Sequence, residues 1–382
     1  MRATTFQRTK KIYPLTSVRF FGALYVVFHH TAKDFSPAFY ERMLVYAPRS
    51  LWTGVLFKLP ASVSFFFLLS GYVLTVVYLR DGKRVDKGKF FAARFARIYP
   101  LYFVTLVLDT PHLLLDKVHR LGPAIGVVKT AGIFLGHTVM LKAWYGQRLR
   151  GIDDPNWSLS AETFFYLCFP MLGFALCKLQ GARLWIVALC LYAGGQLLVV
   201  SVQAHPWLWV PLLHLPTFAL GVLLARWQSL QSRREEDSPS RTWRVYGVMA
   251  LVGVCLSLGA AASSRFSIGS LLFTGLLAPV FAGLIWALSS ADTLIARLLC
   301  ASWLVALGNA SFALYLIHTP MLHLFEYLHW TALPGIYPVY LALTIGLSLL
   351  SFYAFETPVR LRLLRWFHLR SLERLEEASI AQ

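Results

Sequence analysis

The sequence predicts an all-α protein, a polytopic membrane bundle of about ten transmembrane helices with both termini in the cytoplasm. Of its 382 residues, 57% are hydrophobic and only 14% are charged, which excludes an ordinary soluble domain. The apolar residues gather in runs long enough to cross a hydrocarbon core, and the basic residues lie mostly between these runs. No nucleic-acid-binding motif accompanies the net charge of +18, so this charge indicates orientation in a membrane and not a nucleic-acid partner.

The predicted spans follow from the apolar runs. They cover residues 15–36, 60–79, 98–115, 157–177, 183–200, 207–225, 245–262, 268–288, 301–325 and 338–356. A further run at 124–142 is interrupted by Lys129 and His137. Whether this run crosses the membrane decides the orientation of everything that follows it.

The distribution of basic residues favours the arrangement in which 124–142 does not cross. With ten spans and the N-terminus inside, 24 of the 36 Lys and Arg residues fall on inner segments and 11 on outer ones, and Arg19 lies within the first span. A crossing at 124–142 would turn most of the later basic residues outward, against the positive-inside rule. We therefore interpret residues 116–156 as an outer-face excursion in which 124–142 lies along or dips into the membrane, shielded by protein.

The chain is predicted to form one integral-membrane domain over residues 1–360. It contains a flexible cytoplasmic loop at about 227–243 and is followed by a basic cytoplasmic tail at 361–382. There is no internal repeat of fixed period. The cysteines lie in or beside apolar runs without metal-ligand spacing, so we expect no metal site.

The first span, Leu15 to Ser36, carries ionisable side chains that lipid disfavours, which marks it as functional. Arg19 and His30 are eleven positions apart, three helical turns plus about 20°, so both side chains leave one face about 16 Å apart along the axis. Asp34 follows His30 by one turn and is placed to fix its tautomer. His29 points about 100° away.

Two further motifs have structural as well as functional explanations. Arg94 and Arg97, three apart at the start of the third span, suit a polyphosphate, but as an inner positive cluster they also suit orientation and anionic lipid. Ser70 and Gly71 form a small pair in the second span, which is typical of close helix packing and could also line a substrate tunnel.

The segment that opens the fourth span contains Glu162 and Tyr166, one turn apart on one face, behind Trp157. A carboxylate near a helix start and a tryptophan at the interface need no catalytic role, but Glu162 lies about a turn deeper than a cap requires. His318 precedes Pro320, where it could satisfy a kinked backbone or act as a ligand or catalyst. The other histidines towards outer edges need no function; they are His137, His205, His323 and His329.

Taken together, these motifs resemble the acyltransferase 3 family of integral-membrane O-acyltransferases, which modify cell-surface carbohydrates and some small molecules. The resemblance rests on Arg19 and His30, FFFLLSGYVLT, RFARIYP, NWSLSAETFFYLCFP and SFALYLIHTP, in this order. It implies that the protein lies in the inner (plasma) membrane. It also implies that the donor is cytoplasmic acyl-CoA, usually acetyl-CoA. It also implies a saccharide or glycolipid acceptor outside, surrounding membrane lipid, and no cofactor or nucleic acid. Glu162 stands alone where the family usually has consecutive acidic residues and a glutamine.

Carried over by position, the resemblance and the residue analysis together give a candidate site. The candidate catalytic residues are His30, Glu162 and Asp34. The candidate donor- or substrate-binding residues are Arg19, Arg94, Arg97, Ser70, Trp157, Ser160, Tyr166 and His318. In this arrangement Glu162 opens its span at the outer face, whereas Arg94 and Arg97 lie at the inner face.

Two questions stay open at the level of sequence. His30 could remove the proton of the acceptor hydroxyl during direct transfer, or it could carry the acyl group as an acyl-histidine. From a different class, a flippase or exporter of lipid-linked saccharides could use Arg19 and His30 to bind an anionic head group. The lack of repeats argues against this alternative.

Overall fold

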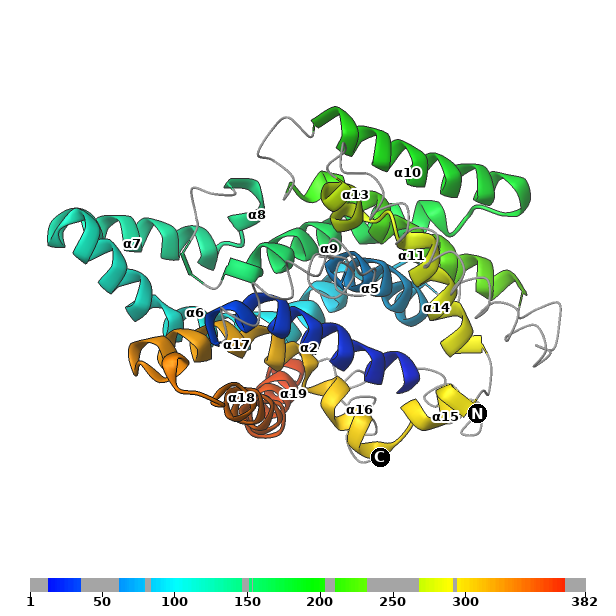
Figure 1. Cartoon of the computed structure of the whole chain (residues 1–382). Helices are drawn as coiled ribbons and strands as arrows, with labels where there is room; N and C mark the ends of the chain where they lie inside the picture. Colours follow the sequence, from blue (N-terminus) through cyan, green and yellow to red (C-terminus); the bar gives the residue numbers. More distant parts are fainter. Residues whose placement is uncertain are drawn as a thin grey trace. The chain divides into compact units, whose positions relative to one another are not determined.

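The computed structural model describes residues 13–35, 62–79, 84–145, 151–152, 154–202, 210–231, 268–290 and 294–367. All regular elements in these ranges are helical, and no strand occurs among them, as the sequence predicts (Figure 1). The predicted span at 245–262, most of the predicted loop at 227–243 and the tail beyond residue 367 lie outside the described residues.

The contacts within the chain divide it into two compact units that are interleaved in sequence. The first unit comprises Met1–Val26, Ala38–Val85 and Leu167–Gly308, and the second comprises Val27–Pro37, Asp86–Tyr166 and Asn309–Gln382. Helices α2 (Tyr13–Phe35) and α9 (Trp157–Leu176) begin in one unit and end in the other, and only the last residue of α16, Asn309, falls in the second unit. Each unit is described by itself below.

The first unit is built around α5 and α11, with the start of α2 and the end of α9. Its helices are α5 (Ser62–Tyr78), α10 (Gly181–Val202), α11 (Pro211–Gln231), α13 (Ile268–Thr274), α14 (Ala278–Ser290), α15 (Leu294–Leu299) and α16 (Ser302–Asn309). Phe65, Leu68 and Tyr72 of α5 pack in one buried cluster with Ala225 of α11 and Ile285 of α14. Its core is therefore made by the apolar faces of helices far apart in sequence.

Glycines set the close approach of α5 and α11. A Cβ atom at Gly71 would lie 2.1 Å from the carbonyl oxygen of Phe218, and one at Gly221 would lie 2.0 Å from that of Leu68. Neither position accommodates a side chain, so the two backbones touch through a reciprocal pair of glycines. This confirms the close packing predicted from Gly71.

The predicted span 268–288 is interrupted in the structure, and the cause is local. Gly275 has φ +116°, a conformation that other residues rarely adopt, and it separates α13 from α14. Next to it, the Thr217 hydroxyl on α11 donates a hydrogen bond to the Thr274 carbonyl at 2.9 Å. This contact with α11 satisfies a carbonyl at the interruption.

The second unit is built around α6 and α17, with the end of α2 and the start of α9. Its elements are α6 (Lys87–Leu121), α7 (Pro123–Thr138), α8 (Lys142–Tyr145), the 3₁₀ turn η2 (Asp154–Asn156), α17 (Ser311–Tyr327), the 3₁₀ turn η3 (Trp330–Ala332), α18 (Tyr337–Ser351), the π-turn η4 (Phe352–Glu356) and α19 (Thr357–Trp366). Helix α17 packs on α6 and α18, and α19 packs on α6. Residues 361–366 thus continue as a helix docked on the unit.

Helices α6 and α7 form a hairpin, visible in Figure 1. Gly122, with φ +80°, makes the turn. At the far end of α7, the hydroxyl of Tyr102 donates to the His137 carbonyl at 2.8 Å, and the hydroxyl of Tyr99 donates to the Thr138 carbonyl at 3.2 Å. Helix α7 therefore returns antiparallel along α6 to the level where the predicted span 98–115 begins.

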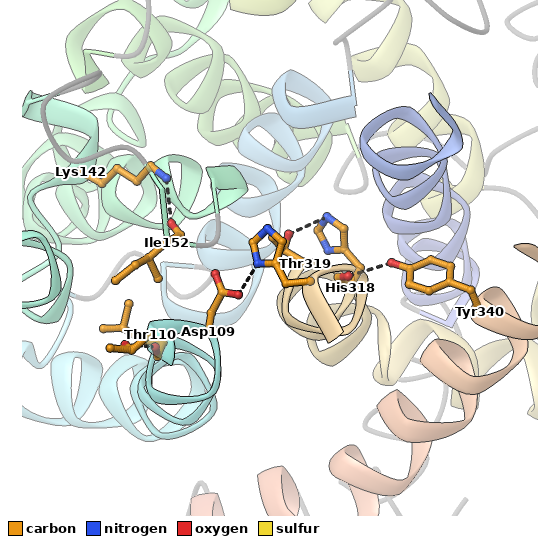
Figure 2. A network of polar contacts seen from close by, with 9 residues as sticks. Asp109, Thr110, Lys142, Ile152, His318, Thr319 and Tyr340 are labelled. Carbon is orange, nitrogen blue, oxygen red and sulfur yellow. Dashed lines mark hydrogen bonds and ion pairs between the residues drawn. The ribbon is translucent and has the colours of Figure 1, made fainter. Parts of the chain in front are cut away.

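Some of the described residues after α7 are buried by protein. Lys142 is 1% exposed, and its ammonium group donates to the carbonyl of Ile152 at 3.2 Å; Ile152 and Asn156 are fully buried (Figure 2). Non-helical backbone at membrane depth requires this kind of shielding. The position of the hairpin in a membrane, and with it the predicted outer-face excursion, stays a prediction.

By length and composition, four helical stretches of the described residues are suited to cross a membrane. They are α6, α9, α10 and the continuous stretch Tyr337–Trp366. Helices α16 and α17 would make a fifth if they form one broken span. The described α2, α5 and α11 coincide with predicted runs within a few residues but do not meet this stricter criterion, so the total of ten spans and the cytoplasmic termini stay predictions.

Candidate functional site

Two of the predicted site residues, His30 and His318, meet in the second unit. The ring centroids of His30 on α2 and His318 on α17 are 5.6 Å apart, with an angle of 84° between the rings. His30 is half-buried, whereas His318 is fully buried. The sequence predicts each histidine singly but not this edge-to-face couple, because the couple depends on how α2 and α17 pack.

The nitrogens of His318 are engaged by its own helix. Nδ1 lies 2.7 Å from the carbonyl oxygen of Tyr315, and because a carbonyl can only accept, Nδ1 carries the proton. Nε2 is then the acceptor for the hydroxyl of Thr319 at 3.3 Å. The hydroxyl of Tyr340, in the first turn of α18, donates to the His318 carbonyl at 2.7 Å (Figure 2). His318 is thus held in one tautomer, two residues ahead of Pro320, which favours a bend in the helix.

Helix α17 is tied to the start of α9 beside this couple. The hydroxyl of Tyr315 donates to the carbonyl of Pro155 at 2.6 Å and shares a hydrogen bond with the hydroxyl of Ser158 at 2.7 Å. Tyr315 precedes His318 by three residues, and their rings are 6.0 Å apart. The first turn of α9 therefore lies close to the histidine couple.

A second polar group joins α6 to α9. The hydroxyl of Tyr166 donates to Glu162 Oε1 at 2.6 Å, one turn earlier on α9. The guanidinium carbon of Arg94 lies 6.0 Å from the centroid of the Tyr166 ring, within the range of a cation–π interaction. Arg94, Tyr166 and Glu162 therefore form one cluster.

This cluster corrects the expected arrangement in depth. We expected Glu162 and Arg94 at opposite faces of the membrane, but both contact the same tyrosine. The reason is the α6–α7 hairpin: Ser160 Oγ donates to the Met140 carbonyl and accepts from the Ala143 amide at 3.1 Å, so α9 begins beside the end of the returning α7. A helix that starts there brings Glu162 towards Arg94.

Arg97 has a different environment from Arg94, although the two share a motif. A guanidinium nitrogen of Arg97 lies 3.2 Å from Glu356 Oε1. The Glu356 side chain is 2% exposed, and it stands at the end of η4, where α18 passes into α19. The structure thus pairs Arg97 with a buried carboxylate, whereas the Arg94 guanidinium faces Tyr166.

The remaining predicted residues are placed as follows. Ser160 is buried and its hydroxyl is used in the two backbone contacts described above, and Trp157 is 6% exposed at the first position of α9. Arg19 and Ser70 belong to the first unit, on α2 and α5. Asp34 lies one turn after His30 and within electrostatic range of His323. The binding and catalytic roles of these residues stay predictions.

The sequence analysis missed one buried pair. Asp109 on α6 is 1% exposed, and its carboxylate lies 2.5 Å from Nδ1 of His323 on α17 (Figure 2). We had assigned no function to His323. Asp109 is a lone carboxylate within the predicted span 98–115, and this should have marked it as a functional candidate.

Apolar helices that enclose a histidine couple and an arginine–tyrosine–glutamate cluster define a membrane protein with a polar site among its helices. The chain belongs to the acyltransferase 3 family: the family model, described as an acyltransferase domain, matches residues 12–353. The protein is therefore a membrane acyltransferase.

Two relatives were found among curated proteins. Acyltransferase MdmB of Streptomyces mycarofaciens is 29% identical over 337 residues, which cover 81% of this chain and 79% of the relative. Protein 2 in the picA locus of Rhizobium radiobacter is 33% identical over 117 residues, covering 26% of this chain and 59% of the relative. No solved structure gave a significant match.

Proposed function

We propose that the protein transfers an acyl group, most simply acetyl, from cytoplasmic acyl-CoA to a hydroxyl of a saccharide or glycolipid on the outer side of the plasma membrane. The family membership and the acyltransferase relative support the reaction class. They also favour acyl transfer over the flippase alternative. No feature of the described residues specifically supports transport of a lipid-linked saccharide. No cofactor besides the co-substrate is invoked.

One observation carries the assignment of the base. In the histidine couple, His318 is fully buried and both of its nitrogens are engaged by α17, whereas His30 is partly exposed. A general base must come within hydrogen-bond reach of the proton that it removes. His30 is the member of the couple that a substrate can reach, and His318 holds its ring from the side.

The proposed step is a direct transfer. His30 takes the proton of the acceptor hydroxyl, the hydroxyl oxygen attacks the thioester carbonyl, and the carbon–sulfur bond breaks. The departing thiolate then receives the proton from the His30 imidazolium, so that free CoA and the ester leave a neutral histidine. The acyl-histidine route divides the same reaction into two transfers and uses the same residue.

Arg94 is the proposed contact for the donor phosphates. It lies in the cluster with Tyr166 and Glu162, whereas the Arg97 charge is matched by Glu356. Ser158, which bonds to Tyr315 beside His318, and Tyr166 are eight residues apart on α9, about 12 Å of helix axis. Such a separation suits a donor whose charged and reactive ends are far apart.

The test compares His30→Ala with His29→Ala, the neighbouring histidine on a different face of α2. We expect His30→Ala to retain acetyl-CoA binding and to lose at least about 10²-fold in transfer, because general-base catalysis is typically worth about 10²- to 10⁴-fold. Binding is measured on purified protein. Transfer is measured as CoA release and as acetylation of surface saccharides by mass spectrometry.

The control variant His29→Ala should keep most of the activity. An essential His29 with a dispensable His30 would contradict the assignment of the base. If the wild-type protein transports a lipid-linked saccharide without turning over acetyl-CoA, the acyl-transfer proposal itself fails and the flippase alternative stands.

A further inference from the structure

Beyond the histidine couple, the second unit gathers metal-ligating side chains where α17 packs on α6. A ring nitrogen of His112, a ring nitrogen of His323 and a carboxylate oxygen of Glu326 all lie within 4.8 Å of one another. The rings of His112 and His323 are stacked, with centroids 3.7 Å apart and an angle of 6° between them. Three groups of the kinds that bind transition metals therefore converge from two helices.

The spacing on each helix explains the convergence. Asp109 and His112 are three residues apart on α6, and His323 and Glu326 are three residues apart on α17, so each pair shares a helix face. Because the two helices pack together, the two faces meet. The sequence predicted no metal site because the cysteine spacing excluded one, and this group joins positions more than 200 residues apart.

The contact between Asp109 and His323 has the form of a metal ligand with its supporting carboxylate. Nδ1 of His323 faces the carboxylate of Asp109, so Nε2, on the other side of the ring, is the nitrogen placed to bind a metal ion. Histidines that bind metals almost always donate their other ring N–H to a carboxylate or carbonyl, which fixes the tautomer and raises ligand basicity. Asp109, at 1% exposure, is placed to do this for His323.

The stacked rings point the same way. The two rings lie parallel with centroids 3.7 Å apart, and a nitrogen of each lies within 4.8 Å of the other and of a carboxylate oxygen of Glu326. Neutral imidazole is the form that binds a metal ion. A cation bound between the two imidazoles and Glu326 would therefore have suitable ligands on each side, with the Asp109 carboxylate behind His323.

We propose that His112, His323 and Glu326 bind one divalent transition-metal ion of the zinc type, with Asp109 orienting His323. Two imidazoles and one carboxylate suit zinc, whereas magnesium and calcium prefer oxygen ligands. Bonds of about 2.0–2.1 Å place tetrahedral ligands roughly 3.4 Å apart, so the exposed His112 needs only to tilt towards the other two. Three protein ligands leave a fourth position for water or a substrate oxygen.

The ion would lie close to the histidine couple of His30 and His318. The assignment of His30 as the base does not depend on this ion. His323 follows His318 by five residues, about 7.5 Å along α17. Metal binding is measured directly and does not depend on acyl transfer, so the two proposals fail independently of each other.

The experiment titrates Zn²⁺ alone into the full-length protein in detergent, stripped beforehand with a chelator, by calorimetry in the presence of excess Mg²⁺. We expect one saturable equivalent per chain. The triple variant His112→Ala/His323→Gln/Glu326→Gln should lose this equivalent. Asp109→Asn should weaken the affinity by about 10- to 100-fold, as the loss of a supporting carboxylate typically does.

Two single variants keep the result interpretable if the triple variant does not fold. His112 is exposed, so His112→Ala should leave the fold intact and still weaken zinc binding by at least about tenfold. His119→Ala, an exposed histidine on the same helix, should bind zinc like the wild type. Absence of a saturable equivalent, displacement by Mg²⁺, or equal affinity in His112→Ala and wild type would overturn the proposal.

Discussion

At the scale of the residue, Arg94 and Arg97 show how one motif can serve two purposes. Their spacing of three places them on the same side of α6, and the sequence treats them as equivalent. In the structure, Arg97 is paired with the buried carboxylate of Glu356, whereas Arg94 lies over the ring of Tyr166. The pair therefore divides into a structural arginine and a candidate donor-binding arginine.

This division predicts different effects of the two alanine variants. Arg97→Ala leaves the 2%-exposed side chain of Glu356 without this cation, which should destabilise the protein by up to about 3–5 kcal/mol. Arg94→Ala should lose less stability than Arg97→Ala, because it keeps the cation beside Glu356, and it should bind acetyl-CoA at least about tenfold more weakly, because a charge-assisted contact to phosphate is lost. Thermal unfolding and acetyl-CoA affinity per folded molecule are measured on the same preparations.

A double variant serves as the control for the buried pair. Arg97→Met combined with Glu356→Gln removes both charges and should recover part of the stability that Arg97→Ala loses. If Arg97→Ala is as stable as Arg94→Ala, the pairing with Glu356 does not carry the role that we assign to it.

How far single residues can be predicted from the sequence depends on where their partners lie. His30, His318, Arg94 and Glu162 are recognisable from local motifs, whereas none of their contacts with another helix is. Asp109 and His323 are 214 residues apart, and only the packing of α6 on α17 makes them a pair. An isolated carboxylate in an apolar run is a signal that sequence analysis can use, but its partner is not visible there.

At the scale of the element, the contact between α5 and α11 depends on glycine. Gly71→Leu would drive a side chain into the backbone of α11, where even a Cβ atom would lie 2.1 Å from a carbonyl oxygen. We expect a loss of at least about 1–3 kcal/mol in stability, the usual range for overpacking, seen as a lower unfolding temperature in detergent.

Gly194→Ala is the matched control for this contact, because nothing lies within 4 Å of a Cβ atom at this position in α10 of the same unit. Alanine is the better helix former by about 1 kcal/mol, so this variant should be as stable as the wild type or more so. Equal losses in both variants would mean that the α5–α11 contact is not the cause.

Element bounds follow the sequence closely where one apolar run forms one helix. The predicted spans 60–79, 157–177 and 183–200 correspond to Ser62–Tyr78, Trp157–Leu176 and Gly181–Val202. The run 268–288 fails as a single helix because Gly275 and its contact with α11 interrupt it. Hydrophobicity predicts the length of an apolar run, but it cannot predict that a contact with another helix interrupts the run.

At the scale of the whole molecule, the α6–α7 hairpin bears on topology. With ten spans, a cysteine introduced at Gly146 should be labelled by an impermeant reagent from outside, and a reporter fused after Gln382 should read as cytoplasmic. Both expectations rest on the distribution of Lys and Arg between inner and outer segments.

Labelling at Gly146 from the cytoplasmic side alone would mean that 124–142 crosses the membrane. The topology of every later segment would then be reversed. Protection of Gly146 from both sides would contradict the predicted exposure of this residue at the outer face.

The interleaving of the two units has a consequence for biosynthesis. Asp109 leaves the ribosome 214 residues before His323, which at about 5–20 residues per second is roughly 10–40 s. During this interval α6 enters the membrane with a carboxylate that lacks its final partner. Insertion machinery or neighbouring helices must tolerate that polar group until α17 emerges, so the polar centre is completed only near the end of translation.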